Sequence, residues 1–102
     1  MSYFLMMTKR EVMRMTALKQ NYEDQLSSLP KGTIRKKERN GRIYFYLAYR
    51  ADGKVVSKYI GNDESALDDL RERLERRKNI EALLKSIKSE LRLMSRALEV
   101  AR

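Results

Sequence analysis

Two short dipeptides constrain the fold of this chain more than any other feature. Asn40-Gly41 and Asp52-Gly53 each pair residues that tolerate the positive φ angles of a type I′ turn. Both are flanked by β-branched and aromatic runs, which is the pattern of a β-hairpin. The middle of the chain is therefore predicted to be a three-stranded antiparallel meander. Its expected strands are residues 33–38, 42–50 and 55–60.

Helical periodicity flanks the predicted meander on both sides. Residues 4–28 carry apolar side chains at spacings of three and four, and Pro30 follows as a stop. Residues 62–101 are predicted to be helical, with Asn62 or Asp63 as the N-cap. The expected fold class is α+β, with an N-terminal helix, the meander, and a long C-terminal helix or helix pair. At 102 residues we expect a single domain, 1–102.

The C-terminal helical segment carries two apolar stripes that are out of phase. The first contains Leu67 and Leu74, and the second starts six residues after Leu74. We therefore expect a bend or a break near residues 76–79, with the basic cluster there as a solvated elbow or as a second phosphate contact. The second stripe has the 4-3-4-3-4 spacing of a coiled-coil seam, which predicts an oligomer interface. Its residues are Ile80, Leu84, Ile87, Leu91, Met94 and Leu98.

Two-residue turns fix the register of the meander. Ile34 should pair with Leu47, Phe45 with Ile60, and Tyr46 with Tyr59. Strand alternation then divides the sheet into two faces. The apolar face is expected to be buried, and it contains Ile34, Ile43, Phe45, Leu47, Tyr49, Val56 and Ile60. The opposite face is basic and aromatic.

The positive charge is concentrated in the meander. The chain has a formal net charge of +9, and residues 30–61 hold nine basic side chains against two acidic ones, a net +7. Lys and Arg that follow phosphates, together with exposed aromatic rings, are typical of a nucleic-acid surface. The predicted binding residues are Arg35, Lys37, Arg42, Tyr44, Tyr46, Arg50, Ser57, Lys58 and Tyr59. A second interpretation stays open, in which a flanking helix covers the tyrosines as a small core.

The composition argues against most catalytic chemistry. The chain has no Cys and no His, which removes disulfides, cysteine zinc sites and the usual general base. We expect no enzymatic activity, no metal, no cofactor and no small-molecule substrate. The apolar run at the N-terminus is too short for a membrane span and makes a poor secretory signal, so we expect a cytoplasmic protein with no membrane partner. The four methionines at 6, 7, 13 and 15 favour core filling over an adaptable binding surface.

The run YFYLAYRADGKVVSKYIG, residues 44–61, resembles the hairpin of a family of small uncharacterised prokaryotic proteins, in which it follows an LPKG-like lead-in, here residues 29–32. Similar strands occur near the N-termini of some transposases, and the layout resembles the arm-binding domain of phage-type integrases. The resemblance covers residues 29–74. It implies a mobile-element or phage context and favours nucleic acid, but it assigns no site residues.

Together these patterns predict a non-enzymatic nucleic-acid-binding protein, with DNA expected ahead of RNA, that forms a dimer or another homo-oligomer through its helices. The alternative is an adaptor of a phage or mobile element that docks on a protein partner through its helices, including an inhibitor of a host nucleic-acid enzyme.

Overall fold

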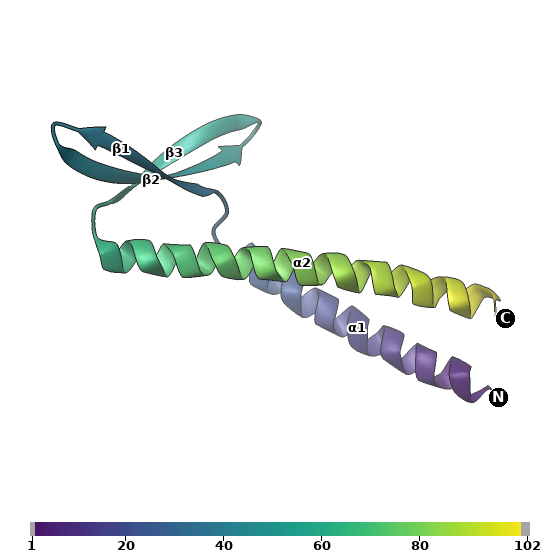
Figure 1. The fold of residues 1–102 in the computed structure, drawn as a ribbon. Helices are drawn as coiled ribbons and strands as arrows, with labels where there is room; N and C mark the ends of the chain where they lie inside the picture. The colour runs from purple at the N-terminus through teal and green to yellow at the C-terminus, as the bar shows by residue number, and fades with distance from the viewer. Residues whose placement is uncertain (1, 101–102) are drawn as a thin grey trace. The chain divides into compact units, whose positions relative to one another are not determined.

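The fold is a helix, a three-stranded sheet and a second helix in chain order (Figure 1). It is described by a computed structural model covering residues 2–100. The elements are α1 (Tyr3–Ser27), β1 (Thr33–Arg39), β2 (Arg42–Ala51), β3 (Lys54–Gly61) and α2 (Glu64–Val100). The strands pair antiparallel in the order β1-β2-β3. The predicted α+β class and the meander are confirmed.

Short polar side chains define the ends of the helices. The Ser2 hydroxyl accepts a hydrogen bond from the backbone N–H of Leu5 at 3.4 Å, which caps α1. At α2 the Asp63 carboxylate accepts from the N–H of Ser65 at 3.0 Å. Because an N-cap side chain accepts from the second or third helical N–H, Asp63 is the N-cap among the two predicted candidates.

Helix α2 runs through the predicted break without interruption. It is a single helix of 37 residues, so of the two predicted alternatives the structure has the long helix and not the helix pair. The sequence there, ERRKN, contains no Gly or Pro, and Glu, Arg and Lys are good helix formers. The second apolar stripe therefore lies at a different angle around the same continuous helix.

Arg77 is also not part of a solvated elbow. It is half-buried, and its Nη1 donates a hydrogen bond to the backbone carbonyl of Leu29 at 3.0 Å. This bond holds the segment that leads into the sheet against the first part of α2.

The chain divides into two compact units, and α2 contributes to both. One unit joins α1 to the part of α2 that begins at Asn79, and the other is Leu29–Lys78. The boundary falls where the apolar stripe of α2 changes phase.

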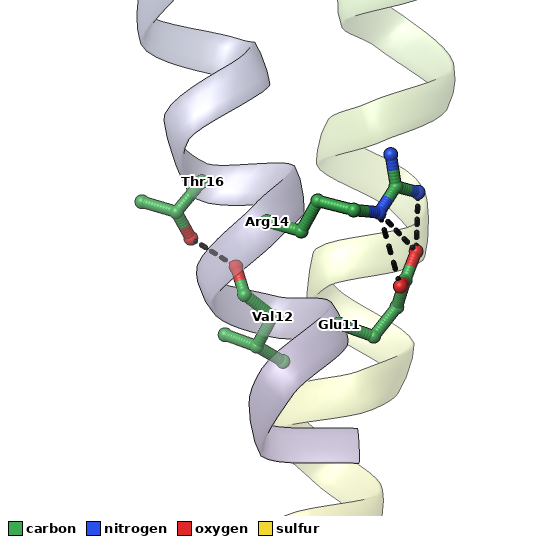
Figure 2. Close-up of polar contacts among 4 residues, drawn as sticks. All are labelled: Glu11, Val12, Arg14 and Thr16. Carbon is green, nitrogen blue, oxygen red and sulfur yellow. Dashed lines mark hydrogen bonds and ion pairs between the residues drawn. The ribbon is translucent and has the colours of Figure 1, made fainter. Parts of the chain in front are cut away.

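The helical unit is an antiparallel pair with its own apolar core. α1 and the second part of α2 lie side by side (Figures 1 and 2). Met15 of α1 is buried, with 8% of its surface exposed. Ile80, Leu84 and Ile87 of α2 are also buried, between 4% and 7% exposed. The first half of the predicted oligomer seam is therefore covered within one chain. Heptad spacing specifies a helical neighbour, and here α1 supplies it.

Polar side chains of α1 bond within the helix, and two of its methionines are exposed. Figure 2 shows the Arg14 guanidinium on the Glu11 carboxylate, with its Nε 3.1 Å from Oε2, and the Thr16 hydroxyl donating to the Val12 carbonyl at 2.7 Å. Met13 is 73% exposed and Met7 is also exposed. Core filling therefore describes Met15 and is wrong for Met7 and Met13.

The register of the sheet agrees with the prediction except at one end. Asn40 and Asp52 have φ of 52° and 51°, and each is followed by a positive-φ glycine, as the type I′ turn requires. Ile34 pairs with Leu47 and Tyr46 with Tyr59. The predicted pairing of Phe45 with Ile60 is wrong, because Phe45 pairs with Gly61 across a bulge. The bulge adds one residue to β3 just before it ends.

The apolar face of the sheet is covered only in part. Leu47 is 8% exposed, and Leu67 of α2, in the same unit, is 3% exposed. Ile34, Phe45, Tyr49 and Ile60 are half-buried. The prediction of burial is wrong for Ile43 and Val56, which are 41% and 36% exposed. They lie close to the hairpin turns, where the sheet extends beyond its core.

Candidate functional site

Three tyrosines form a cluster on the face of the sheet opposite Leu47. The ring of Tyr59 lies 6.1 Å from that of Tyr44 and 5.4 Å from that of Tyr46, measured between centroids, with the planes tilted by 50° and 55°. Tilted pairs at these distances are favourable. Tyr59 remains 55% exposed, and the other two rings are half-buried. The cluster is therefore open to solvent at Tyr59.

A lysine adds positive charge directly to this cluster. The Lys37 Nζ lies 4.9 Å from the centroid of the Tyr46 ring, within the range of a cation–π contact. Lys37 pairs with Tyr44 across the strands, so its side chain reaches along the face to the next ring. The ammonium and the rings form one continuous surface.

The two faces of the sheet differ sharply in charge. Strand alternation from the observed register places five basic residues, and no acidic one, on the tyrosine face. They are Arg35, Lys37, Arg39, Arg42 and Arg50. The opposite face has three lysines and Glu38. All five basic side chains on the tyrosine face are exposed.

The structure separates one predicted binding residue from the rest. Lys58 pairs with Leu47 and so lies on the apolar face, away from the tyrosines. Lys58 is on the other face from Tyr59 because successive side chains along β3 alternate between the two faces of the sheet. Ser57 pairs with Ala48 and does share the tyrosine face. The other predicted binding residues lie together on that face.

A hollow of about 350 Å³ adjoins the cluster, and most of its lining residues belong to the same face. Arg35 and Arg50 line it, and Ala48, at 7% exposure, is the most buried residue around it. The complete lining is Gly32, Thr33, Arg35, Ala48, Tyr49, Arg50 and Val55. Only Arg35 and Arg50 of this lining were predicted as binding residues; Tyr49 and Val55 were not, and neither were the small residues Gly32, Thr33 and Ala48. The signal in the sequence was the small size of Gly32 and Thr33, just after Pro30, and of Ala48 in the middle strand.

Gly32 can enter this crowded place only because it has no side chain. Its φ is +131°, and a Cβ there would lie 2.4 Å from the carbonyl oxygen of Ala48 and 3.1 Å from the Cδ1 of Leu47. Neither the backbone angle nor the space admits another residue without a shift. The lead-in therefore packs directly on the middle strand, at the edge of the hollow.

The helical unit has a hollow of a different kind. It measures about 460 Å³ and is lined by residues of both α1 and α2. Phe4 and Leu93 line it and are 58% and 61% exposed. The remaining lining is Met7, Thr8, Glu11, Met94 and Ala97. Most of this lining is apolar, with Thr8 and Glu11 as the exceptions, whereas the hollow in the sheet has two guanidinium groups.

Residues 2–100 offer little for metal or membrane chemistry. No three carboxylate, imidazole or thiolate groups come together among them as a metal site would require. Neither helix in that range is apolar over a length that could span a bilayer.

These features define a small α+β protein with a cationic, tyrosine-bearing sheet face. Residues 13–72 match the family model described as a domain of unknown function, DUF6788. Because the match covers more than half of the chain, the protein belongs to the DUF6788 family. The matched range takes in most of α1, the whole sheet and the start of α2. No curated protein and no solved structure gives a significant match.

Proposed function

We propose that this protein binds nucleic acid through the tyrosine face of its sheet. The observation that supports it best is the asymmetry of the sheet, with five exposed basic side chains and an exposed tyrosine on one face and no carboxylate among them. Phosphates require that charge, and bases or sugars can rest on the rings. The phage or mobile-element context suggested by the LPKG-led hairpin is part of this proposal.

Binding should depend steeply on salt. Contact with about four to six phosphates gives a slope of log K against log salt of about −3 to −5. Fluorescence anisotropy with labelled DNA and RNA oligonucleotides between 50 and 200 mM KCl, about the range over which such slopes are measured, would test it. Absence of binding to every oligonucleotide at low salt would refute the proposal.

Charge reversal on one face at a time provides a matched test. Arg35→Glu with Arg50→Glu changes the net charge by the same amount as Lys54→Glu with Lys58→Glu, but the second pair lies on the opposite face. We expect the first variant to lose at least 100-fold in affinity and the second to lose less than 10-fold, because close contacts outweigh the general field. Equal losses would mean that net charge alone causes binding.

The second candidate function is docking on a protein or on another copy through the helical unit. The observation in its favour is the apolar hollow, with Phe4 and Leu93 largely exposed around it. Self-association through this hollow would leave the buried seam at Ile80, Leu84 and Ile87 in place. Sedimentation of Phe4→Ser with Leu93→Ser should show a smaller species than the parent chain. Met13→Ser is the control, because Met13 is exposed on α1 outside the hollow.

A further inference from the structure

The tyrosine face is built in rows that run across the strands. The register puts Arg35, Tyr46 and Tyr59 in one row, Thr33, Ala48 and Ser57 in the next, and Arg50 and Val55 in a third. Side chains on one face repeat every two residues, so neighbouring rows are about 7 Å apart. A row of small residues therefore separates the aromatic row from Arg50.

The small row explains the hollow. Ala48 has a single methyl group at the centre of the sheet, while long guanidinium side chains stand at Arg35 and Arg50 on either side of it. Guanidinium groups bind phosphate oxygens through paired N–H donors. The Thr33 hydroxyl, which also lines the hollow, can donate one more hydrogen bond. The hollow therefore has the donors for a phosphate group and more than enough room for it.

The adjacent row offers a ring face to a base. Tyr59 is in contact with Tyr44 and Tyr46 and is still 55% exposed. Its two neighbours fix the orientation of the ring, so little rotamer freedom remains to be lost on binding. A paired and stacked duplex hides the faces of its bases, whereas an unpaired strand presents them.

We propose that the sheet binds a single-stranded polynucleotide, with a phosphate in the hollow between Arg35 and Arg50 and a neighbouring base on the Tyr59 ring. This rests on the proposed function and deepens it. The shared chemistry of DNA and RNA, a phosphate and a base about one row apart, is what the face recognises. Duplex nucleic acid can reach the arginines but cannot stack on the tyrosine.

The first test compares strand forms. Anisotropy titrations use a labelled dT oligonucleotide, the matching rU oligonucleotide and a DNA hairpin duplex with the same number of phosphates, all in the same buffer. We expect single strands to bind at least 10-fold more tightly than the duplex. The dT and rU arms distinguish DNA from RNA, and either one binding more tightly than the duplex supports the proposal.

The second test removes the ring. Tyr59→Leu should weaken single-strand binding by about 5- to 150-fold, the measured range for losing one stacked base. Tyr59→Phe keeps the ring and should retain most of the affinity. Tyr3→Leu is the matched control, because Tyr3 is 72% exposed on α1. Duplex binding should be unchanged in all three variants.

The third test removes one guanidinium from the hollow. Arg50→Gln should lower the salt slope for single strands by about 0.7, the value of one phosphate contact. Lys54→Gln makes the same charge change on the opposite face and should leave the slope unchanged. Equal slopes for the two variants would overturn the assignment of the hollow. Circular dichroism checks that each variant is folded.

The outcomes separate this inference from the proposed function. Duplex binding as tight as single-strand binding, with Tyr59→Leu harmless, overturns the single-strand inference and leaves the nucleic-acid function standing, provided that reversal of Arg35 and Arg50 abolishes binding. No binding to any of the three oligonucleotides at low salt overturns both.

Discussion

The helical unit and the sheet unit use their apolar residues in different ways. In the helical unit the first half of the most regular stripe is buried, with Ile80, Leu84 and Ile87 between 4% and 7% exposed. In the sheet unit the apolar face is only partly covered, and Ile43 stays 41% exposed. The sheet instead depends on local geometry, including two tight turns, a glycine at a crowded position and the hydrogen bond of Arg77. Burial is therefore more complete in the helical core than on the apolar face of the sheet. Five exposed basic side chains lie on the other face of the sheet, with the tyrosines.

The largest expected effect tests the buried seam. Leu84→Ala should lower the free energy of unfolding by about 2–5 kcal/mol, because it opens a cavity in the helical core. Leu83→Ala is the control, since the neighbouring Leu83 is 46% exposed, and it should cost less than about 1 kcal/mol. Urea unfolding followed by circular dichroism measures both. Equal losses would show that α1 does not cover Leu84 more than Leu83.

The next effect concerns the backbone of the sheet unit. Gly32→Ala should destabilise by about 1–3 kcal/mol or more, because its Cβ would lie 2.4 Å from the Ala48 carbonyl oxygen. Gly53→Ala is the control. Gly53 also has a positive φ, but nothing lies within 4 Å of the added Cβ. The control should cost about 1–2 kcal/mol, the penalty of a left-handed backbone for a residue with a Cβ. Amide hydrogen exchange in β2 would localise the difference, and a larger effect at Gly53 would contradict the crowding at Gly32.

A smaller effect is expected at the lead-in to the sheet. Arg77→Gln removes the donor to the Leu29 carbonyl and should cost about 1–2 kcal/mol. Lys78→Gln makes the same charge change at an exposed position and should be nearly neutral. Faster exchange of the amides around Gly32 in the Arg77 variant alone would sharpen the comparison. If both variants behave alike, the hydrogen bond does not hold the lead-in.

The smallest effect lies on the exposed surface of α1. The hydrogen bond from Arg14 lowers the pKa of Glu11 below its usual value of 4.5. A lowered pKa stabilises the fold above the unfolded-state value, and this contribution is lost as the pH falls through the folded-state pKa. Arg14→Gln should therefore be slightly destabilising at pH 7 and less destabilising at about pH 3, which lies below the usual pKa of a glutamate. Arg10→Gln is the control, and urea unfolding at both pH values measures the difference.

Much of the sheet was predictable because short-range rules determine it. Asn40-Gly41 and Asp52-Gly53 specified turn type, and turn type specified that Tyr46 faces Tyr59. The bulge before Gly61 was not predictable from the alternation of apolar and polar side chains. It comes at the end of β3, so the alternation along the rest of the strand is the same with the bulge as without it. The bulge takes Ile60 out of its predicted pairing with Phe45, but Tyr46 still pairs with Tyr59.

The helices show where periodicity stops being informative. The spacing from Ile80 to Leu98 predicts a helical neighbour but does not say whether the neighbour belongs to the same chain. The candidate site was predicted largely through its charged and aromatic members. Gly32, Thr33 and Ala48 were missed because small residues carry no charge or ring, and their role depends on what stands next to them.

Both outer strands of this sheet are edges, and β1 carries its charge there. Within residues 2–100, β1 has a neighbouring strand on one side only. It carries Arg35, Lys36, Lys37 and Arg39, with Glu38 as its one acidic residue. Unpaired strand edges template pairing with other chains, and rows of cationic side chains oppose it by repulsion. The same cations that the proposed ligand would neutralise therefore oppose edge-to-edge pairing between two copies of this sheet.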